Sequence, residues 1–252
     1  MRGLEIRGLV MSYRQGLPNA LDGVNVVIQP GEHVAIVGRT GSGKSSLAIT
    51  LFRLYQPRPG FQISIDGKRL ELMDLYKARR QLAIIPQEPY LFSGTLRQQF
   101  CEYTRCVSQG LPTDGLKRIP DQKLWGLLEK VQLADYVRKQ PGGLDCAVIG
   151  NGDNFSAGQR QLICVVRALL RDAKVVILDE ATAYVDHKTD QIIQGIVKNY
   201  LKNVIVLSIA HRLDTVIDMD KVLVMDKGRV AEFGTKMELA QMPDGIFRSL
   251  LN

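Results

Sequence analysis

The stretch Gly38-Arg-Thr-Gly-Ser-Gly-Lys-Ser45 decides the fold that we predict for this chain. It follows an apolar, β-branched run, His33–Val37, and precedes Ser45–Arg53, where apolar residues recur at helical spacing. A strand, a glycine-rich turn and a helix in this order form a P-loop, whose backbone N–H groups surround a polyphosphate. We therefore predict a nucleotide site, with the lysine on the β- and γ-phosphates and the last serine on Mg²⁺. The alternative is a glycine-rich surface turn.

A second segment, Val175-Val-Ile-Leu-Asp-Glu180, ends an apolar run with two adjacent carboxylates. One acid at such a strand end suits the shell of a metal ion, and its neighbour suits the activation of a water molecule. Together with the P-loop, this segment predicts that the chain binds ATP with Mg²⁺ and hydrolyses it. The alternative interpretation is a pair of buried structural acids.

The composition is that of a soluble globular protein, with 252 residues of which 45% are hydrophobic and 23% are charged. No apolar run approaches the roughly 18 residues that a membrane span needs, and Met1–Ile6 lacks the apolar core of a signal peptide. The net charge of +7 comes from basic residues spread along the chain, without the aromatic-interleaved stripe that base stacking needs. We expect no nucleic-acid partner, and contact with a membrane surface or an acidic partner stays open.

The chain has four cysteines, Cys101, Cys106, Cys146 and Cys164. They contain no CxxC pair, and no histidines stand at the spacing of zinc ligands. We expect reduced thiols of a cytosolic protein and no structural metal.

The first third of the chain alternates short apolar runs with turn residues. Residues 4–37 suggest antiparallel strands that lead to the P-loop, because Gly, Pro and Asn punctuate the runs. Residues 61–86 look similar, with alternation in Phe61–Gly67 and a buried strand at Leu82–Ile85 that Pro86 stops. We therefore expect a partly antiparallel β region before the helical part of the chain.

From about residue 96 to residue 140 the pattern becomes helical and polar, and Tyr103–Gln122 within it predicts a long exposed loop. Residues 158–171 predict a strong helix. Strands at 175–178, 203–208 and 222–225 then alternate with helices, which predicts a parallel sheet. The predicted fold class is α/β: a P-loop NTPase core, which is a mostly parallel sheet with flanking helices, plus an antiparallel β subdomain and an inserted α-helical subdomain.

A third motif, Asn154-Phe-Ser-Ala-Gly-Gln-Arg-Gln161, leads directly into the predicted helix at 158–171. Small residues and a serine at a helix start favour an anion, because free N–H groups and the helix dipole point toward it. Alone, the motif is only an N-cap. In this order and spacing, the three motifs resemble the nucleotide-binding domain of ABC ATPases, with Phe155 and Ala157 where that family's signature sequence most often has leucine and glycine.

The resemblance covers essentially the whole chain and implies a role for each matching residue. The nucleotide-binding residues implied are Tyr13, Gly38, Arg39, Thr40, Gly41, Ser42, Gly43, Lys44, Ser45, Ser46, Ser156, Gly158 and Gln159. The catalytic residues implied are Glu180, His211, Gln87 and Lys44, and the metal ligands implied are Ser45, Gln87 and Asp179.

By the same resemblance, Tyr13 stacks on adenine, although a strand aromatic in the core is the alternative. Gln87 touches Mg²⁺ and the attacking water and links the site to the helical lobe, unless it is a surface glutamine. Glu180 is the general base, and His211 contacts the γ-phosphate. Asp186 closes a segment similar to the family's dimer-contact loop. The other two histidines, His33 and His187, are expected to be ordinary surface residues.

Finer features resemble subfamily C, which contains the multidrug-resistance-associated transporters, the sulfonylurea receptors and a chloride channel. They lie in Val37–Ser46, Pro89–Leu96, Gln159–Leu162 and Asp179–Asp186. The intact Glu180 and the Phe-Ser-Ala-Gly-Gln pattern resemble the second nucleotide-binding domain of that subfamily.

Three departures from the family pattern stand out. Tyr103–Gln122 looks longer than usual, in the lobe that faces the transmembrane partner. Tyr184 stands where a small residue is usual in the dimer loop, which puts close packing there in doubt. Ala157 should be tolerated in the signature, because a methyl group leaves the backbone N–H donors unchanged.

The resemblance implies a single nucleotide-binding domain over residues 1–252, with a core lobe at about 1–86 and 172–252 and a helical lobe with the signature at about 87–171. Ser156 would cap the ATP of a second nucleotide-binding domain in a head-to-tail sandwich. That dimer would power the transmembrane domains of an organic-anion or drug-conjugate transporter, at the cytoplasmic face of a membrane. We expect an excised domain of a larger polypeptide or, as the alternative, a separate subunit.

Two other functions stay open from the sequence. The domain could sense ATP and ADP and gate a channel, as in the receptor and channel members of the subfamily. It could also be a soluble ABC-type ATPase that acts on DNA or ribosomes, but those proteins carry coiled-coil arms or a second ATPase domain in the same chain.

Overall fold

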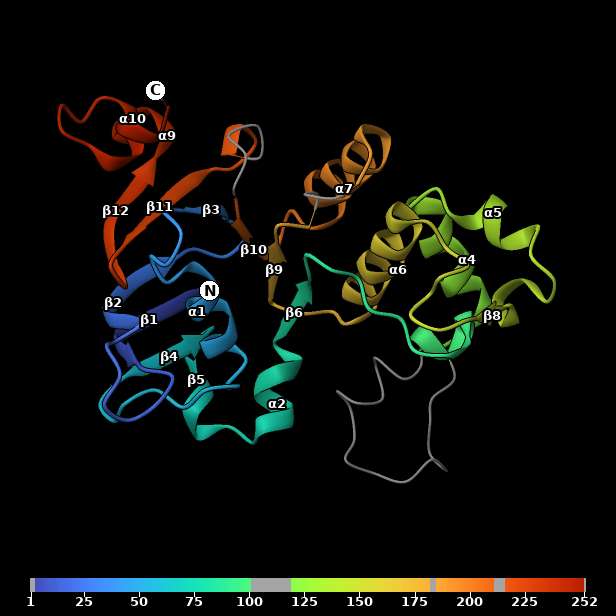
Figure 1. The fold of residues 1–252 in the computed structure, drawn as a ribbon, viewed down its shortest axis with the longest axis horizontal. Coiled ribbons are helices and arrows are strands. Elements are labelled where there is room, and N and C mark those ends of the chain that lie inside the picture. The colour runs from blue at the N-terminus through green and yellow to red at the C-terminus, as the bar shows by residue number, and fades with distance from the viewer. Residues whose placement is uncertain (1–2, 101–118, 182–184, 211–215, 252) are drawn as a thin grey trace. The chain divides into compact units, whose positions relative to one another are not determined.

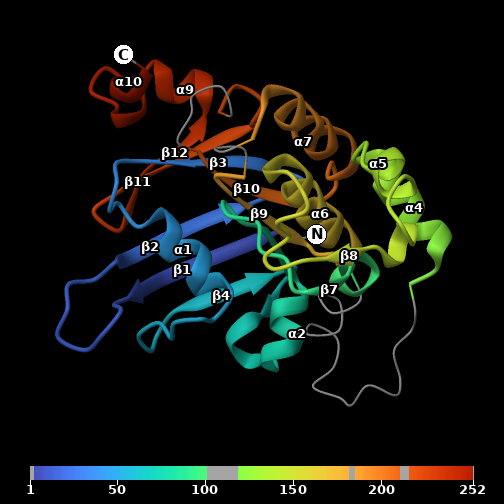
Figure 2. The ribbon, with the colours of Figure 1, turned by 45° about the vertical axis from the view of Figure 1, so that its right-hand side comes forward.

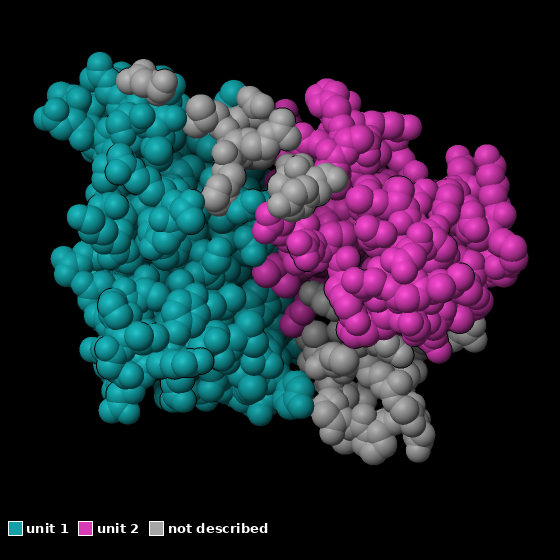
Figure 3. Space-filling model, viewed as in Figure 1, with its two compact units in different colours: residues 1–82, 174–180, 201–252 teal, residues 83–173, 181–200 magenta. Residues whose placement is uncertain are grey.

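The structure is a computed structural model that describes residues 3–100, 119–181, 185–210 and 216–251. The chain forms two compact units (Figure 3). The first unit comprises Met1–Leu82, Lys174–Glu180 and Leu201–Asn252, and the second comprises Ala83–Ala173 and Ala181–Tyr200. His211 and Tyr184 lie outside the described residues, as does most of the segment Tyr103–Gln122.

The first unit contains an antiparallel sheet in the order β2-β1-β4-β5 (Figures 1 and 2). Its strands are β1 (Leu4–Met11), β2 (Leu21–Ile28), β4 (Gln62–Ile65) and β5 (Lys68–Arg69). Leu4 pairs with Ile28 on one side and with Ile65 on the other, and all three side chains are buried. The sheet is the antiparallel β subdomain that the alternating pattern predicts.

The second sheet of this unit carries the P-loop. Its strands follow the order β12-β11-β3-β10-β9, and β3, β10, β9 and β11 run parallel. The bounds are β3 (His33–Val37), β9 (Val175–Asp179), β10 (Ile205–Ile209), β11 (Lys221–Asp226) and β12 (Arg229–Thr235), with β12 antiparallel to β11. The predicted α/β class is confirmed, and β3 and β9 both end at the edge where ligands of such sheets bind.

One sequence-based expectation is wrong at β3. Residues 4–37 suggest antiparallel strands that lead to the P-loop, but β3, the last strand of this range, lies in the parallel sheet. Four of its five residues are buried in succession, whereas buried and exposed residues alternate along most of β2. A strand buried on both faces has such a continuous apolar run, which is typical of parallel sheets.

Short helices complete the first unit: α1 (Lys44–Leu51), the 3₁₀ turn η1 (Leu70–Leu72), α2 (Leu75–Arg80), α9 (Lys236–Ala240) and α10 (Ile246–Leu251). Leu239 of α9 and Phe247 of α10 join Ala35 of β3 and Val222 of β11 in one buried cluster. The C-terminal helices therefore cover the strand that leads into the P-loop. The strand β6 (Leu82–Ile85) begins at the last residue of this unit.

The second unit is mainly helical (Figures 1 and 2). It contains α4 (Asp121–Lys130), α5 (Ala134–Arg138), η3 (Gly143–Asp145), α6 (Ala157–Leu170), α7 (His187–Tyr200) and the short pair β7 (Gly94–Thr95) and β8 (Ala147–Val148). The helix predicted at 158–171 is thus α6, and Asp121 and Gln122 of the expected loop open α4 instead. α7 lies in this unit, although the predicted core lobe included it. The division into a core lobe and a helical lobe stays a prediction.

None of the helices in the described part of the chain is both long and apolar enough to cross a membrane. Two cysteines lie in that part, Cys146 and Cys164, and both are free, buried thiols. Burial raises the pKa of each thiol above its ordinary value.

Candidate functional site

The P-loop joins β3 to α1, and close backbone approach explains two of its glycines. Gly38 has φ +148°, and a Cβ there would lie 2.3 Å from the carbonyl oxygen of Met225. Gly43 has φ +106°, and a Cβ there would lie 2.8 Å from the carbonyl oxygen of Ala20. Only glycine fits such positions without moving the backbone. The loop is therefore held against its neighbours on one side, while Arg39, Thr40 and Gly41 stay exposed on the other.

Lys44 is buried at the first position of α1. Its Nζ donates hydrogen bonds to the carbonyl oxygens of Gly38, at 2.8 Å, and Arg39, at 3.1 Å. Burial lowers the pKa of Lys44 from its ordinary value, and the charge of Glu180 opposes this shift. The structure thus brings Lys44 and Glu180, which lie far apart in the sequence, within electrostatic range of each other.

A buried hydroxyl in the loop has no partner. Ser42 is 4% exposed, and its Oγ makes no hydrogen bond to any described residue. The helix α1 begins without an acidic side chain in its first turn, so its N–H groups and dipole remain available to an anion. An unpartnered donor, a buried ammonium and a free helix start together fit a polyphosphate.

Tyr13 lies just beyond the end of β1 and is 41% exposed, so it is not a core residue. Its hydroxyl lies 2.9 Å from the Oγ of Ser46 in α1. Its ring also makes an edge-to-face contact with Tyr55, with 4.9 Å between the ring centroids. The exposed ring of Tyr13 is therefore held to α1 through its hydroxyl and packed against the ring of Tyr55.

The two predicted carboxylates end β9. Asp179 is its last residue, and Glu180 follows with φ +47°, a left-handed conformation that is uncommon for a residue with a side chain. The Glu180 N–H donates to the carbonyl oxygen of Ile209, at 3.3 Å, at the end of β10. Both side chains are half-buried. Local backbone strain of this kind is concentrated at functional sites.

The donor set suits Mg²⁺, which takes oxygen ligands and usually keeps only one or two from the protein, with phosphate and water supplying the rest. Ser45 offers an exposed hydroxyl at the start of α1, and Asp179 offers a carboxylate. Within the described ranges, no three His, Cys, Asp or Glu side chains gather as a metal cluster. The residues therefore fit a metal held mainly by a bound phosphate chain.

The signature motif begins α6 in the second unit. Ser156 accepts a hydrogen bond from the Gln159 N–H at 3.2 Å, and the Gln159 side chain accepts one from the Ser156 N–H at 2.9 Å. This reciprocal pair is a capping box. Ser156 and Ala157 are exposed, while Phe155 is buried against the ring of Tyr136. Phe155, at the position where leucine is usual, thus anchors the motif in the core of the second unit.

One predicted site residue, His211, lies outside the described residues, and the structure places another, Gln87, in the second unit. Gln87 is half-buried in the second unit and directly follows Pro86, whose carbonyl oxygen accepts a hydrogen bond from Gln161 Nε2 at 2.9 Å. The predicted site residues therefore divide between the two units, with the P-loop and both acids in the first and Gln87 and the signature in the second.

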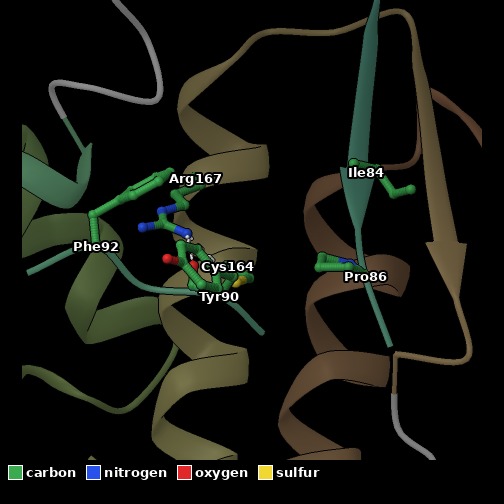
Figure 4. Close-up of a pocket in the computed structure, with 6 residues that line it drawn as sticks. All are labelled: Ile84, Pro86, Tyr90, Phe92, Cys164 and Arg167. Carbon is green, nitrogen blue, oxygen red and sulfur yellow. Dashed lines mark hydrogen bonds between the residues drawn. The ribbon is translucent and has the colours of Figure 1, made fainter. Parts of the chain in front are cut away.

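A pocket of about 200 Å³ opens in the second unit beside α6 (Figure 4). Its lining is Ile84, Pro86, Tyr90, Phe92, Cys164 and Arg167. The guanidinium of Arg167 is buried and donates to the carbonyl oxygen of Tyr90 at 2.6 Å and to that of Gln99 at 3.2 Å. The rings of Tyr90 and Phe92 meet edge to face at the surface, where both are about half exposed. The wall of the pocket is mainly apolar.

The model of the protein family described as "ABC transporter" matches residues 21–183 of this chain. The chain belongs to the ABC transporter family. The matched region is the ATP-binding domain of that family. The predicted resemblance is confirmed.

Relatives place the chain near subfamily C of the ABC transporters. It is 44% identical over 249 residues to ABC transporter C family member 12 of Dictyostelium discoideum and 47% identical over 250 residues to ATP-binding cassette sub-family C member 10 of Mus musculus. These matches cover 99% and 98% of this chain, but 18% and 16% of the relatives. The chain thus spans less than a fifth of the curated relatives that it matches.

A solved structure supports the fold. A bacterial Atm1-family ABC exporter with ATP bound matches with a TM-score of 0.86 and 30% identity, over 99% of this chain and 41% of the exporter chain. This agreement confirms the P-loop NTPase fold that the motifs predict for this ABC domain.

Sequence reasoning missed three residues that the structure places beside the site. Tyr55 braces Tyr13, and no pattern signals it because the contact depends on the fold. Gln161 was quoted in the signature motif but received no role. Thr189 bonds Asp186 at the start of α7, and the three-residue spacing of an N-cap could have revealed that pair.

Proposed function

We propose that this chain is one half of an ATP-driven motor that closes head to tail on a second nucleotide-binding domain and powers an organic-anion or drug-conjugate transporter of subfamily C. The observation that carries the proposal is a P-loop in which the buried Lys44 lies on the loop carbonyls and the Oγ of Ser42 makes no hydrogen bond to any described residue, with the charge of Glu180 within electrostatic range of Lys44. A nucleotide-binding module without turnover would not require the second acid.

The proposed chemistry is phosphoryl transfer to water, in which positioning and charge neutralisation supply most of the rate. The P-loop N–H groups and Lys44 hold the β- and γ-phosphates. Glu180 orients the attacking water and accepts its proton, and His211 contacts the γ-phosphate. Tyr13 stacks on the adenine. The loop carbonyls of Gly38 and Arg39 accept hydrogen bonds from the ammonium of Lys44, which holds it against the loop.

Ser45, Gln87 and Asp179 are the residues that would hold Mg²⁺. When bound, the ion neutralises the charge on the β- and γ-phosphate oxygens and on the leaving group. The side chains themselves are oxygen donors, which suits this ion.

The signature would act on the partner's nucleotide rather than on this chain's own. The N–H groups at the start of α6, together with Ser156, Gly158 and Gln159, would cap the γ-phosphate bound by the facing domain. The capping box supports this role, because it fixes the first turn of α6 while Ser156 stays exposed. The partner would offer the same motif in return.

The transmembrane partner would dock on the second unit. Tyr90, Phe92 and Ile149 are exposed apolar side chains, and Ser93 and Gly150, which neighbour two of them, share a hydrogen bond. An exposed apolar patch beside a pocket indicates a protein contact. The relatives extend far beyond the region that this chain matches, which leaves ample length for membrane-spanning domains. This chain would then lie at the cytoplasmic face of the membrane.

The channel-gating alternative has less support, because one relative described above is named an ABC transporter and the matching solved structure is named an ABC exporter. The decisive test is the ATPase rate as a function of protein concentration in the presence of Mg²⁺. A specific activity that rises with concentration is expected if two copies form the sandwich. Clear ATP binding with a flat, near-zero rate would mean that the site needs a different partner domain. No ATP binding would contradict the proposal.

A further inference from the structure

The signature helix holds both ends of the short segment that carries Gln87. The carbonyl oxygen of Pro86, just before Gln87, accepts the hydrogen bond from Gln161 Nε2 at 2.9 Å. The carbonyl oxygen of Tyr90, three residues after Gln87, accepts one from Arg167 Nη1 at 2.6 Å. Residues 87–89 therefore lie between two carbonyl groups that side chains of the same helix, α6, hold in place.

The two anchors are built differently. Arg167 also bonds the backbone and side chain of Gln99, so it belongs to a larger buried network that supports the pocket wall. The side chain of Gln161 makes a single hydrogen bond to the described residues. Although it is 1% exposed, its Oε1 accepts no hydrogen bond from any described residue. Gln161 is thus dedicated to the carbonyl group that precedes Gln87.

A buried amide such as that of Gln161, with its donor bonded and its acceptor unpaired among the described residues, adds little to the stability of the fold. Its unpartnered acceptor loses the hydrogen bonds that water gives it in the unfolded chain, which offsets the gain from the bond to Pro86. A methionine of similar length would fill the same space without an unpartnered polar atom. Buried residues that leave a polar group unpaired, and so do not stabilise the fold, are expected mainly at functional positions.

We propose that Gln161 is a positioning residue for Gln87: it sets where Gln87 stands by holding the Pro86 carbonyl group to the signature helix. The inference rests on the proposed function, in which Gln87 meets Mg²⁺ and the attacking water. Since Ser156 begins the same helix, any movement of Gln87 is transmitted to the signature through five residues of continuous α6. Gln161 thereby links the metal contact to the surface that caps the partner's nucleotide.

The test uses two substitutions with opposite effects on stability. Gln161→Met removes the donor and the unpartnered acceptor, so Tm should stay equal or rise. Gln161→Glu keeps the shape but cannot donate when ionised, so Tm should fall. The matched control is Gln194→Met, which removes an amide that bonds Asp190 within α7.

The readout is ATP affinity of the isolated chain with Mg²⁺ and with a chelator. Both Gln161 variants should bind ATP like the wild type in chelator, lose most of the Mg²⁺-dependent gain in affinity, and need several-fold more Mg²⁺ for half-maximal binding. The control should match the wild type in all respects. A structural role alone would instead make the defect follow Tm, affecting Gln161→Glu and sparing Gln161→Met, and that result would overturn the inference.

A parallel variant, Gln87→Ala, separates this inference from the proposed function. If Gln87→Ala loses the Mg²⁺-dependent gain but Gln161→Met keeps it, the positioning role is wrong and the metal role of Gln87 stands. If Gln87→Ala itself binds Mg²⁺ and ATP like the wild type, the proposed metal role of Gln87 is wrong, and the role of Gln161 falls with it.

Discussion

A Cβ added to Gly158 would lie 2.6 Å from the Oγ1 of Thr189 and 3.2 Å from an oxygen of Asp186. The first turn of the signature helix and the start of α7 therefore touch at a position that only glycine allows. Thr189 itself is held by Asp186, because its hydroxyl donates to the carboxylate at 2.7 Å and its N–H at 3.2 Å. Within the second unit, the end of the predicted dimer-contact loop thus packs directly on the signature.

Gly158→Ala should destabilise the second unit, because the added methyl group has no room beside Thr189. We expect a loss of about 1–3 kcal/mol in the free energy of unfolding, as for other overpacked positions. Chemical denaturation measures this loss. In a double-mutant cycle, Thr189→Ala should recover part of it, and purely additive effects of the two substitutions would contradict the close contact. Ala157→Gly, at an exposed position, is the control.

Lys44→Met should abolish ATP binding without harming the empty protein. Because burial lowers the pKa of Lys44, the folded state destabilises the charged form, and this cost fades as the pH rises through the lowered pKa. We therefore expect an equal or higher Tm without nucleotide. At a concentration hundredfold above the wild-type Kd, ATP should stabilise the wild type by about 2.7 kcal/mol and the variant not at all. A clearly lower Tm for the empty variant would show that the ammonium is a net stabiliser.

Glu180→Gln should keep ATP affinity and lose turnover. Positioned general bases contribute roughly 10²–10⁴-fold to rates, and the amide cannot accept the proton from water. With ATP and Mg²⁺, the variant should accumulate as a dimer, which light scattering coupled to size-exclusion chromatography measures. Asp190→Asn, which removes one carboxylate from α7, is the control and should hydrolyse ATP at the wild-type rate. Hydrolysis by Glu180→Gln at the wild-type rate would assign the base to another residue.

Tyr13→Ala should weaken ATP binding by removing the ring that we expect to stack on adenine. Stacking of a base on an aromatic side chain is worth about 1–3 kcal/mol, or about 5- to 150-fold in affinity. Inorganic tripolyphosphate, which has no base, should bind both proteins equally. Tyr13→Phe keeps the ring and loses only the contact with Ser46, so its affinity should stay within a few-fold of the wild type. Equal losses for both ligands in Tyr13→Ala would indicate damage to α1 instead.

The pH dependence of stability should include a contribution from Asp186. Its pKa lies below the ordinary value of 3.8, chiefly because the Thr189 hydroxyl and then the Thr189 N–H donate to the carboxylate. A lowered pKa in the folded state gives stability that is complete above 3.8 and is lost as the pH falls through the folded-state value. The difference in Tm between the wild type and Asp186→Asn should therefore be constant from pH 7 to about pH 5 and shrink under more acidic conditions. A difference that does not change with pH would contradict the assigned cause.

Local motifs were enough to predict the chemistry of the first unit. A strand, a glycine-rich turn and a lysine at a helix start follow one another in the chain, so spacing alone placed Gly38, Lys44 and Ser45 in one loop. The acids at Asp179 and Glu180 were recognised for the same reason, because an apolar run ends at them. These features depend on backbone periodicity over a few residues, which a sequence displays directly.

Long-range contacts lay beyond such patterns. Nothing in the sequence signals that Gln161 holds the carbonyl group of Pro86, 75 residues earlier, or that Tyr55 braces Tyr13. The parallel pairing of β3 was likewise missed, since its partners β10 and β11 come more than 160 residues later.

The sequence by itself therefore determined the nucleotide-binding motif, the family and the residues suited to the chemistry, since these depend on residue type and spacing along the chain. Only the tertiary structure decided which charges lie within electrostatic range and which carbonyl groups are bound, such as Lys44 near Glu180 and the α6 side chains on the segment that carries Gln87. The physical reason is that such contacts arise from the packing of elements distant in sequence, and that packing is a property of the whole fold.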